Sequence, residues 1–219
     1  MLKAVIFDMD GVVIDSNPFH KQAWEKFMDK KGIPLHEDTF SRIISGTPGD
    51  WAVRTLLGGD IPDEQVEIFV NEIDAGYRES IRNSGELAPL AGLRELLEDL
   101  KKSGILIALA TSAPDENIDL VISGLELNDF FNVIIGKSQV KKGKPDPEVY
   151  LTAMAMLGVR ADQCLVFEDS LAGVQAAVNA RIKTLGVLTT ETADNLLTAG
   201  AYATLRDFTG ITSRDLSEM

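Results

Sequence analysis

The sequence predicts an α/β fold, a doubly wound, Rossmann-like parallel sheet that carries an inserted small all-helical domain. Short, almost continuous apolar runs recur along the chain, as in strands that are buried on both faces of a parallel sheet. Segments with helical spacing of apolar residues separate these runs, which is typical of a doubly wound core. The stretch 16–84 interrupts this alternation, because it contains no convincing strand pattern. We therefore expect a core domain of residues 1–15 and 85–219, and a helical domain of residues 16–84.

The expected strands are short and apolar throughout. Their lack of polar–apolar alternation indicates that helices cover both faces of the sheet. They are Ala4–Phe7, 105–110, Val133–Ile135, 164–167 and 184–187, with a weaker pattern at 202–205.

Apolar residues at helical spacing predict helices between these strands. Leucines recur over 93–100 and Gly104 ends that pattern, and further helices are expected over 118–125 and 149–157. The insert begins with Asn17-Pro18, which is a typical helix start. We expect its first helix to end near Gly32, a short one over 50–57 and a long amphipathic one over 66–81.

Composition excludes several classes of function. The net charge of −13 argues against a nucleic-acid-binding surface. Cys164 is the only cysteine, so an internal disulfide and a cysteine-based zinc cluster are excluded, which fits a cytoplasmic protein. We find no secretory leader and no apolar run that could span a bilayer. We expect no membrane and no obligate protein partner.

Polar residues follow four of the expected strands. In open α/β sheets, ligands bind outside the carboxyl ends of the strands, so these residues are expected to gather at one edge. They are Asp8 and Asp10 after the first strand, Thr111 and Ser112 after the second, Lys144 after the third, and Glu168 and Asp169 after the fourth.

This set of residues can carry phosphoryl transfer. Asp8, Asp10 and Asp169 offer the carboxylate oxygens that Mg²⁺ prefers. Lys144 and the metal would shield phosphate charge, while Asp8 would attack phosphorus and form an aspartyl-phosphate. Asp10 would donate a proton to the leaving oxygen and later accept one from water. Thr111 and the backbone N–H groups beyond it would hold phosphate oxygens.

Each of these residues also has a purely structural interpretation. An Asp-Gly pair is a strong turn signal, and Thr111 or Ser112 can cap the following helix. Lys144 lies in a basic segment of the kind that is usually exposed to solvent. Glu168 and Asp169 can interact favourably with the dipole at the start of a helix that follows them. The functional interpretation is favoured because all four strand ends would otherwise have to be explained separately.

Four motifs together resemble the haloacid dehalogenase-like hydrolase superfamily in order and spacing. They are "DMDGV" at 8–12, "TS" at 111–112, "KPDP" at 144–147 and "FEDS" at 167–170. The insert resembles the small cap domain of the phosphoglycolate phosphatase and β-phosphoglucomutase branch. The resemblance implies a mobile cap and the following roles. Asp8 is the nucleophile and Asp10 is the acid/base. Thr111 and Lys144 bind the phosphoryl group, with Ser112 beside them. Mg²⁺ binds to Asp8, the Asp10 carbonyl and Asp169, with Glu168 next to them.

The segment "DSNPFHKQAW" at 15–24 resembles the hinge and first cap helix of β-phosphoglucomutases, in which a histidine occupies the place of His20. Closure of such a cap would bring Gly46, Thr47 and His20 over the substrate. His20 on a helix is also consistent with a surface or interface residue.

The cap loop departs from the mutases. They carry an arginine that grips the second, non-transferring phosphate, and Gly49 stands at the matching position here. Arg54, Arg42 and Arg78 are the candidate substitutes. A mutase must retain a bisphosphate intermediate, so losing a bidentate clamp weakens that function.

Three hypotheses follow. The favoured one is a Mg²⁺-dependent phosphatase acting on a small phosphorylated metabolite. The second is a hexose-phosphate mutase with the same nucleophile. The third is a phospho-receiver signalling domain, which the length of the chain and the insert after the first strand disfavour.

Overall fold

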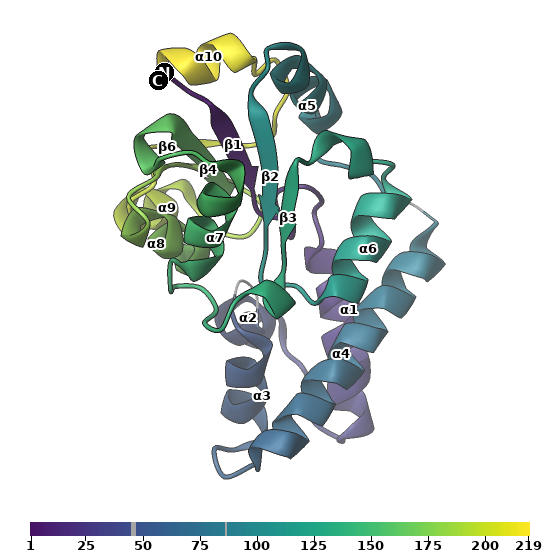
Figure 1. Cartoon of the computed structure of the whole chain (residues 1–219). Coiled ribbons are helices and arrows are strands. Elements are labelled where there is room, and N and C mark those ends of the chain that lie inside the picture. The colour runs from purple at the N-terminus through teal and green to yellow at the C-terminus, as the bar shows by residue number, and fades with distance from the viewer. Residues whose placement is uncertain (45–46, 86) are drawn as a thin grey trace. The chain divides into compact units, whose positions relative to one another are not determined.

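The computed structural model describes residues 1–44, 47–85 and 87–219. They form two compact units (Figure 1). The core unit comprises Met1–Asp15 and Ala88–Met219, and the cap unit comprises Ser16–Leu87. The chain therefore leaves the core unit after its first strand, where the insert was expected, and returns three residues after the expected position.

The core unit is built on a six-stranded, all-parallel sheet with the order β3-β2-β1-β4-β5-β6. The chain runs outward from β1 to β3 and then continues on the other side of β1, so β1 lies at the switch point where ligands bind in such sheets. The predicted α/β class is confirmed, and each expected strand is present with ends within one residue. The strands are β1 Ala4–Phe7, β2 Leu106–Ala110, β3 Val133–Ile135, β4 Cys164–Glu168, β5 Lys183–Val187 and β6 Ala203–Leu205.

The register of the three central strands aligns their carboxyl ends. Phe7 of β1 pairs with Leu109 of β2 on one side and with Phe167 of β4 on the other. The next residue on each segment is therefore Asp8, Ala110 or Glu168, and these lie at one level of the sheet edge. Strand pairing alone thus places an acid from β1 beside an acid from β4.

Helices cover the sheet on both faces (Figure 1). The last two helices were not expected from the sequence, because each spans fewer than eight residues and shows little periodicity; threonine caps at Thr192 and Thr212 mark their starts. The helices are α5 Leu93–Lys102, α6 Asp115–Gly124, α7 Glu148–Leu157, α8 Leu171–Asn179, α9 Ala193–Ala199 and α10 Ser213–Glu218, with 3₁₀ turns at Asn128–Phe130, Lys137–Gln139 and Ala161–Gln163.

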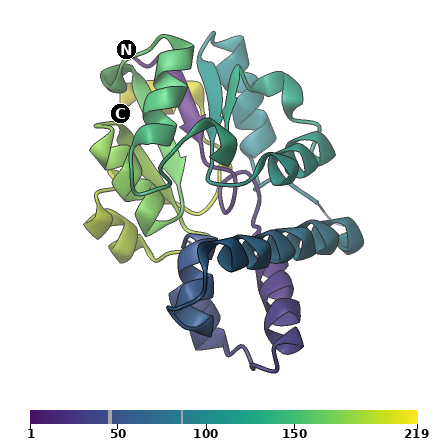
Figure 2. The same cartoon turned by 60° about the horizontal axis from the view of Figure 1, so that its bottom comes forward.

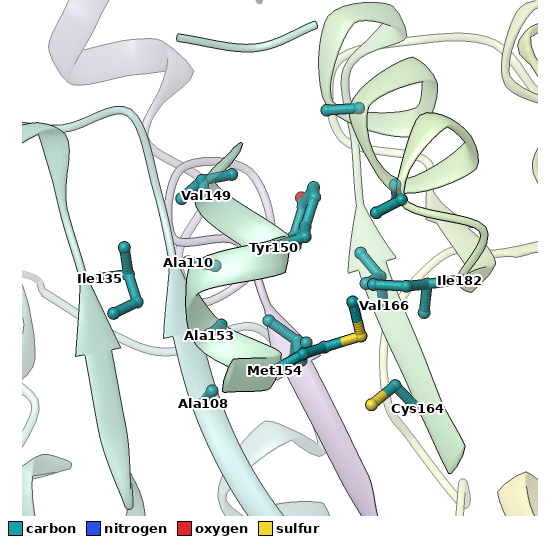
Figure 3. Close-up of a cluster of buried hydrophobic side chains, with 14 of the residues drawn as sticks. Ala108, Ala110, Ile135, Val149, Tyr150, Ala153, Met154, Cys164, Val166 and Ile182 are labelled. Atoms are coloured by element: carbon teal, nitrogen blue, oxygen red, sulfur yellow. The ribbon is translucent and has the colours of Figure 1, made fainter. Parts of the chain in front are cut away.

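The buried cluster under α7 and α8 contains several alanines, which allow these helices to pack close to the strands. Figure 3 shows Ala108, Ala110 and Ala153 in this cluster, with Tyr150 as its one large aromatic side chain. The opposite face carries an aromatic group: Phe7 and Phe167 stack with ring centroids 5.1 Å apart, and both meet the edge of Phe208.

Every secondary-structure element that the structure describes in the cap unit is a helix or helical turn (Figure 2). Its three longer helices match the expected ones, whereas a three-residue helix and a π-helical turn between the first two were not anticipated. The elements are α1 Asn17–Lys30, α2 Glu37–Thr39, the π-helical turn Phe40–Ile44, α3 Gly49–Leu57 and α4 Asp63–Ser84. Among the described residues of both units, no helix has the length and apolar character needed to cross a membrane.

Close packing of α1 against α4 forms the core of the cap unit. At Gly76 of α4 a Cβ atom would lie 3.4 Å from the Ala23 side chain and 3.6 Å from its Cα, so the two helices approach to within contact distance of a small side chain here. One turn further, the Phe27 ring meets Trp24 and Phe69 edge-on at centroid distances of 6.0 and 5.4 Å. These buried aromatic contacts hold the two helices together.

Candidate active site

The Asp-Gly pair that follows β1 is both a turn and part of a site. The carbonyl of Met9 accepts hydrogen bonds from the backbone of 12–14, which closes a tight turn. Gly11 has φ +74°, and a Cβ there would lie 1.8 Å from Asp169 Oδ2. Glycine is therefore required by the turn and by the close approach of the β4 loop. Asp8 leads into this turn and is buried, whereas Asp10 within it is half-buried.

Lys144 joins the loop after β3 to the ends of the central strands. Its ammonium Nζ donates to Asp8 Oδ1 at 2.7 Å and to Glu168 Oε1 at 2.5 Å. A third hydrogen bond, at 3.2 Å, goes to the carbonyl of Ala110. The three donors of the ammonium are thus directed at groups from β1, β2 and β4, and only 8% of the Lys144 residue surface is exposed.

Asp169 is held by the segment that follows β5. Thr190 Oγ1 donates to Asp169 Oδ2, and Thr189 Oγ1 donates to the same oxygen at 3.3 Å. The same Thr189 hydroxyl donates at the shorter distance of 2.5 Å to the carbonyl oxygen of Gly11, so the two acceptors share its one proton. Two neighbouring threonines therefore tie the β4 loop to the β1 turn, and both contacts on Asp169 use its Oδ2 atom.

The charges of this site are unbalanced. Burial raises the pKa of Asp8 to about 7, and the Glu168 charge adds to this effect while Lys144 opposes it. Burial, with the charges of Glu168 and Asp8, also raises the pKa of Asp169 well above its ordinary value. Burial alone would lower the pKa of Lys144, but the charges of Asp8 and Glu168 outweigh it and raise this pKa. One buried cation therefore faces three buried acids.

The donor set fits a divalent cation. One oxygen from each of Asp8, Glu168 and Asp169 lies within 4.8 Å of the others, and all three residues are buried. Hard cations such as Mg²⁺ prefer carboxylate oxygen. An added cation would also relieve the excess of negative charge that raises the pKa of Asp8 and Asp169.

The two hydroxyl residues after β2 differ in environment. Thr111 is buried, its backbone N–H donates to the Ile135 carbonyl, and its Oγ1 accepts from the Ala113 backbone N–H at 3.1 Å. Ser112 is exposed. Both lie directly after β2 at the edge that carries Asp8, but their binding of phosphate stays a prediction.

The predicted cap residues belong to the cap unit. His20 on α1 stacks on Tyr77 of α4 with ring centroids 4.2 Å apart. Thr47 Oγ1 donates to the carbonyls of Ile43 and Ile44 at 2.6 and 3.0 Å. Gly46 lies outside the described residues. A role for these residues in substrate binding stays a prediction.

Sequence reasoning overlooked three residues of the site. Thr189 and Thr190 follow β5, and the argument from strand ends would have found them had it been applied to that strand. Tyr150 fell within an apolar helical pattern, yet its hydroxyl donates to Glu168 Oε1 at 2.5 Å. A period of apolar residues does not distinguish a tyrosine that only packs from one whose hydroxyl reaches a carboxylate.

Comparison with known proteins identifies the family. Residues 5–187 match the family model described as haloacid dehalogenase-like hydrolase. The chain belongs to this family of hydrolases. The match spans the two acids after β1, Lys144 and the acids after β4, and the structure confirms the fold that the resemblance implied.

Relatives of the chain are similar over almost their whole length. A phosphorylated carbohydrates phosphatase from Thermotoga maritima is 36% identical, with 94% of each chain covered. A β-phosphoglucomutase from Bacillus subtilis is 32% identical over 85% of this chain and 83% of its own. The crystal structure of a haloacid dehalogenase-like hydrolase (family IA, variant 3) from Entamoeba histolytica is 30% identical, with a TM-score of 0.92 and 99% and 98% of the two chains covered.

Proposed function

We propose that this hydrolase is a Mg²⁺-dependent phosphatase that releases phosphate from a small phosphorylated metabolite through an aspartyl-phosphate on Asp8. The observation that carries the proposal is the buried contact of Lys144 with Asp8, 2.7 Å long, beside Glu168 at the end of β4 and Asp169 after it. It supports the proposal because a cationic donor lies against Asp8, while the remaining carboxylates exceed the one buried cation and could hold a metal.

The proposed reaction has two steps, which use these residues as follows. An oxygen of the Asp8 carboxylate forms a bond to phosphorus while the bond from phosphorus to the alcohol oxygen breaks. Asp10 donates its proton to that leaving oxygen. Water then attacks the phosphorus, its proton passes to Asp10, and the bond to Asp8 breaks. Lys144 and Thr111 hold the transferring group, with Ser112 beside them.

Asp8, Asp169 and the main-chain carbonyl of Asp10 would hold Mg²⁺, with Glu168 beside them. When bound, the ion shields the charges of the phosphate and of Asp8, so that two anions can approach each other. In the cap unit, Gly46, Thr47 and His20 are the residues proposed to contact the rest of the substrate.

We propose phosphorylated sugars or sugar alcohols as the first substrates to test, because relatives are named phosphorylated carbohydrates phosphatase, β-phosphoglucomutase and hexitol phosphatase B. A panel of such esters with Mg²⁺ should release inorganic phosphate in steady state. A receiver-like domain would instead keep its acyl-phosphate and turn the esters over poorly.

Substitution of the nucleophile tests the proposal. Asp8→Asn keeps the size of the side chain but removes the attacking charge, so we expect phosphate release to fall by more than about a thousandfold. Asp129→Asn makes the same change at an exposed position and should leave the rate unchanged. Circular dichroism would establish that both variants fold. Turnover by Asp8→Asn at the wild-type rate would exclude Asp8 as the nucleophile.

A mutase is the second candidate, favoured by the similarity to β-phosphoglucomutase. The contacts of Arg54 support the phosphatase instead: its guanidinium donates to the Ile61 carbonyl at 2.7 Å and pairs with Asp63. This arginine is thus paired within the cap unit, and those contacts would have to be given up for it to bind a phosphate. Incubation with β-glucose 1-phosphate and a trace of bisphosphate separates the candidates, because a mutase forms glucose 6-phosphate without releasing phosphate.

A further inference from the structure

The Glu168 carboxylate is enclosed by protein donors. Its Oε1 atom accepts from Lys144 Nζ and from the Tyr150 hydroxyl, each at 2.5 Å. Its Oε2 atom accepts from the backbone N–H groups of Asp169 and Ser170 at 3.1 and 3.4 Å, and from Ser170 Oγ at 3.3 Å. No surface of Glu168 is exposed. Both oxygens of this carboxylate are therefore already hydrogen-bonded to protein groups, which indicates a structural role beyond ligand binding.

The backbone of α8 closes the remaining side of the carboxylate. A Cβ atom at Gly173 would lie 1.9 to 2.1 Å from the carboxyl atoms of Glu168. A distance below 3.0 Å cannot be accommodated without movement, so the glycine is required for Glu168 to occupy this position. The carboxylate is therefore confined between α8 on one side and the Tyr150 hydroxyl on another.

Tyr150 touches both members of the Lys144–Glu168 ion pair. Its hydroxyl binds Glu168, and its ring centroid lies 5.2 Å from Lys144 Nζ. The ring is itself fixed, because Tyr150 is fully buried in the cluster of Figure 3 beside Ala153 and Met154 of α7. The Tyr150 hydroxyl thus connects this packed cluster to Glu168, and Glu168 in turn binds Lys144 at the candidate site.

We propose that Tyr150 is a positioning residue: its hydroxyl holds Glu168 Oε1 so that the Lys144 ammonium stays directed at Asp8 and at the phosphoryl group that Asp8 receives. This inference rests on the proposed phosphatase function and adds a residue to it. Glu168 then serves chiefly to locate Lys144, while the cation depends on Asp8 and Asp169.

Tyr150→Phe tests the role of the hydroxyl, because it keeps the ring and its contact with Lys144. A hydrogen bond to a charged group is commonly worth about ten- to a hundredfold in an equilibrium, so we expect kcat to fall by about tenfold or more. Binding of inorganic phosphate, measured by calorimetry in the presence of Mg²⁺, should weaken by a similar factor. Binding of Mg²⁺ alone should stay within about twofold of wild type.

Tyr202→Phe is the matched control. Tyr202 is 58% exposed, and its ring also makes a cation–π contact, with Lys183 Nζ 4.4 Å from the ring centroid. Both substitutions therefore remove a hydroxyl and keep a cation–π contact, but only Tyr150→Phe is expected to change kcat. A lower melting temperature with unchanged kcat and phosphate affinity would show a role in packing alone and would overturn the proposal.

Two further variants show whether Tyr150 acts through Glu168. In a Glu168→Gln background, Tyr150→Phe should cost less than about twofold in kcat, since the interaction it supports is already lost. Gly173→Ala displaces Glu168 without touching Tyr150 and should reproduce the loss of kcat and of phosphate binding, even if Tyr150→Phe folds poorly. Gly59→Ala, where a Cβ meets nothing within 4 Å, is its control.

The outcomes separate the two proposals. If the wild-type protein hydrolyses esters and Tyr150→Phe and Gly173→Ala match it in kcat and phosphate affinity, the positioning role is wrong and the phosphatase function stands. If the wild-type protein neither hydrolyses esters nor binds phosphate, the proposed function fails and this inference fails with it. Independent, multiplicative losses in the Tyr150→Phe and Glu168→Gln variants would also contradict an action through Glu168.

Discussion

At the scale of single residues, the site depends on atoms that act on one another across the chain. Lys144 reaches Asp8 over 136 positions of sequence, and Thr189 reaches Gly11 over 178. Short hydrogen bonds in a buried setting are effective because little water competes for the donors and acceptors. Single substitutions and single reactive side chains can therefore test the environment of these buried residues.

Loss of the Thr190 hydroxyl should weaken the binding of Mg²⁺. Thr190 donates to Asp169 Oδ2, so Thr190→Val leaves a proposed metal ligand less well oriented. Residues that orient metal ligands typically contribute ten- to a hundredfold in affinity, and we expect the Mg²⁺ concentration for half-maximal activity to rise about tenfold. Calorimetry with Mg²⁺ provides a second measure. Thr198→Val, at an exposed position of α9, is the control; equal Mg²⁺ affinities in both variants would contradict this role.

Cys164 should react slowly with thiol reagents near neutral pH. Burial raises the pKa of this thiol to about 11, and the Asp162 charge adds to the effect. The thiolate is the reactive form of cysteine. Below the pKa, the thiolate fraction, and with it the alkylation rate, should rise about tenfold for each increase of about one in pH. We expect alkylation at about pH 8 to be more than about a hundredfold slower in the folded protein than in urea-unfolded protein. Equal rates would show that the thiol is accessible and its pKa ordinary.

At the scale of elements, each unit depends on one close packing of secondary structure. The core unit places α7 against small residues of the sheet, and the cap unit places α1 against α4 through Ala23 and Gly76. In both cases small residues bring the backbones together and a few large rings fill the remaining space. The large rings are therefore where a truncation costs most.

Phe27→Ala should destabilise the cap unit by about 3 to 5 kcal/mol, the usual cost of removing a buried phenyl ring. Phe27 is 2% exposed and contacts the rings of Trp24 and Phe69. Both tryptophans of the chain, Trp24 and Trp51, lie in the cap unit, so urea unfolding followed by tryptophan fluorescence reports on that unit. Ile68→Ala, at a 52% exposed position, should cost less than about 0.5 kcal/mol. A loss of unfolding free energy in Phe27→Ala as small as that in Ile68→Ala would show that the ring cluster contributes little.

At the scale of the whole molecule, the charge of the site connects metal binding to stability. Asp8 and Asp169 have a higher pKa when folded than when unfolded, so each favours the folded state most at low pH. This contribution is lost as the pH rises from the ordinary value of 3.8 through the raised value, which is about 7 for Asp8. A cation that binds the ionised acids would restore it.

Mg²⁺ should therefore stabilise the protein more at about pH 8 than at about pH 5, because protons compete with the cation for the acids at the lower pH. The measurement is the rise in melting temperature at a fixed Mg²⁺ concentration at each pH, compared with protein treated with a chelator. Asp169→Asn removes one of the two acids and should abolish most of the difference. An equal rise at both pH values in the wild-type protein would indicate that Mg²⁺ binds elsewhere.

The sequence by itself determined the α/β class, the strands, the helical insert and the edge at which the polar residues meet. It could do so because apolar runs identify buried strands, and parallel strands bring their carboxyl ends to one edge whatever the details of packing. Asp8, Lys144, Glu168 and Asp169 were found in this way.

Only the tertiary structure decided which atoms bind one another. In it, Glu168 accepts hydrogen bonds from Lys144 and Tyr150, and Asp169 accepts them from Thr189 and Thr190. The position of Glu168 also requires a glycine at 173. These assignments depend on side-chain packing between segments that are distant along the chain, and no local period encodes such distances.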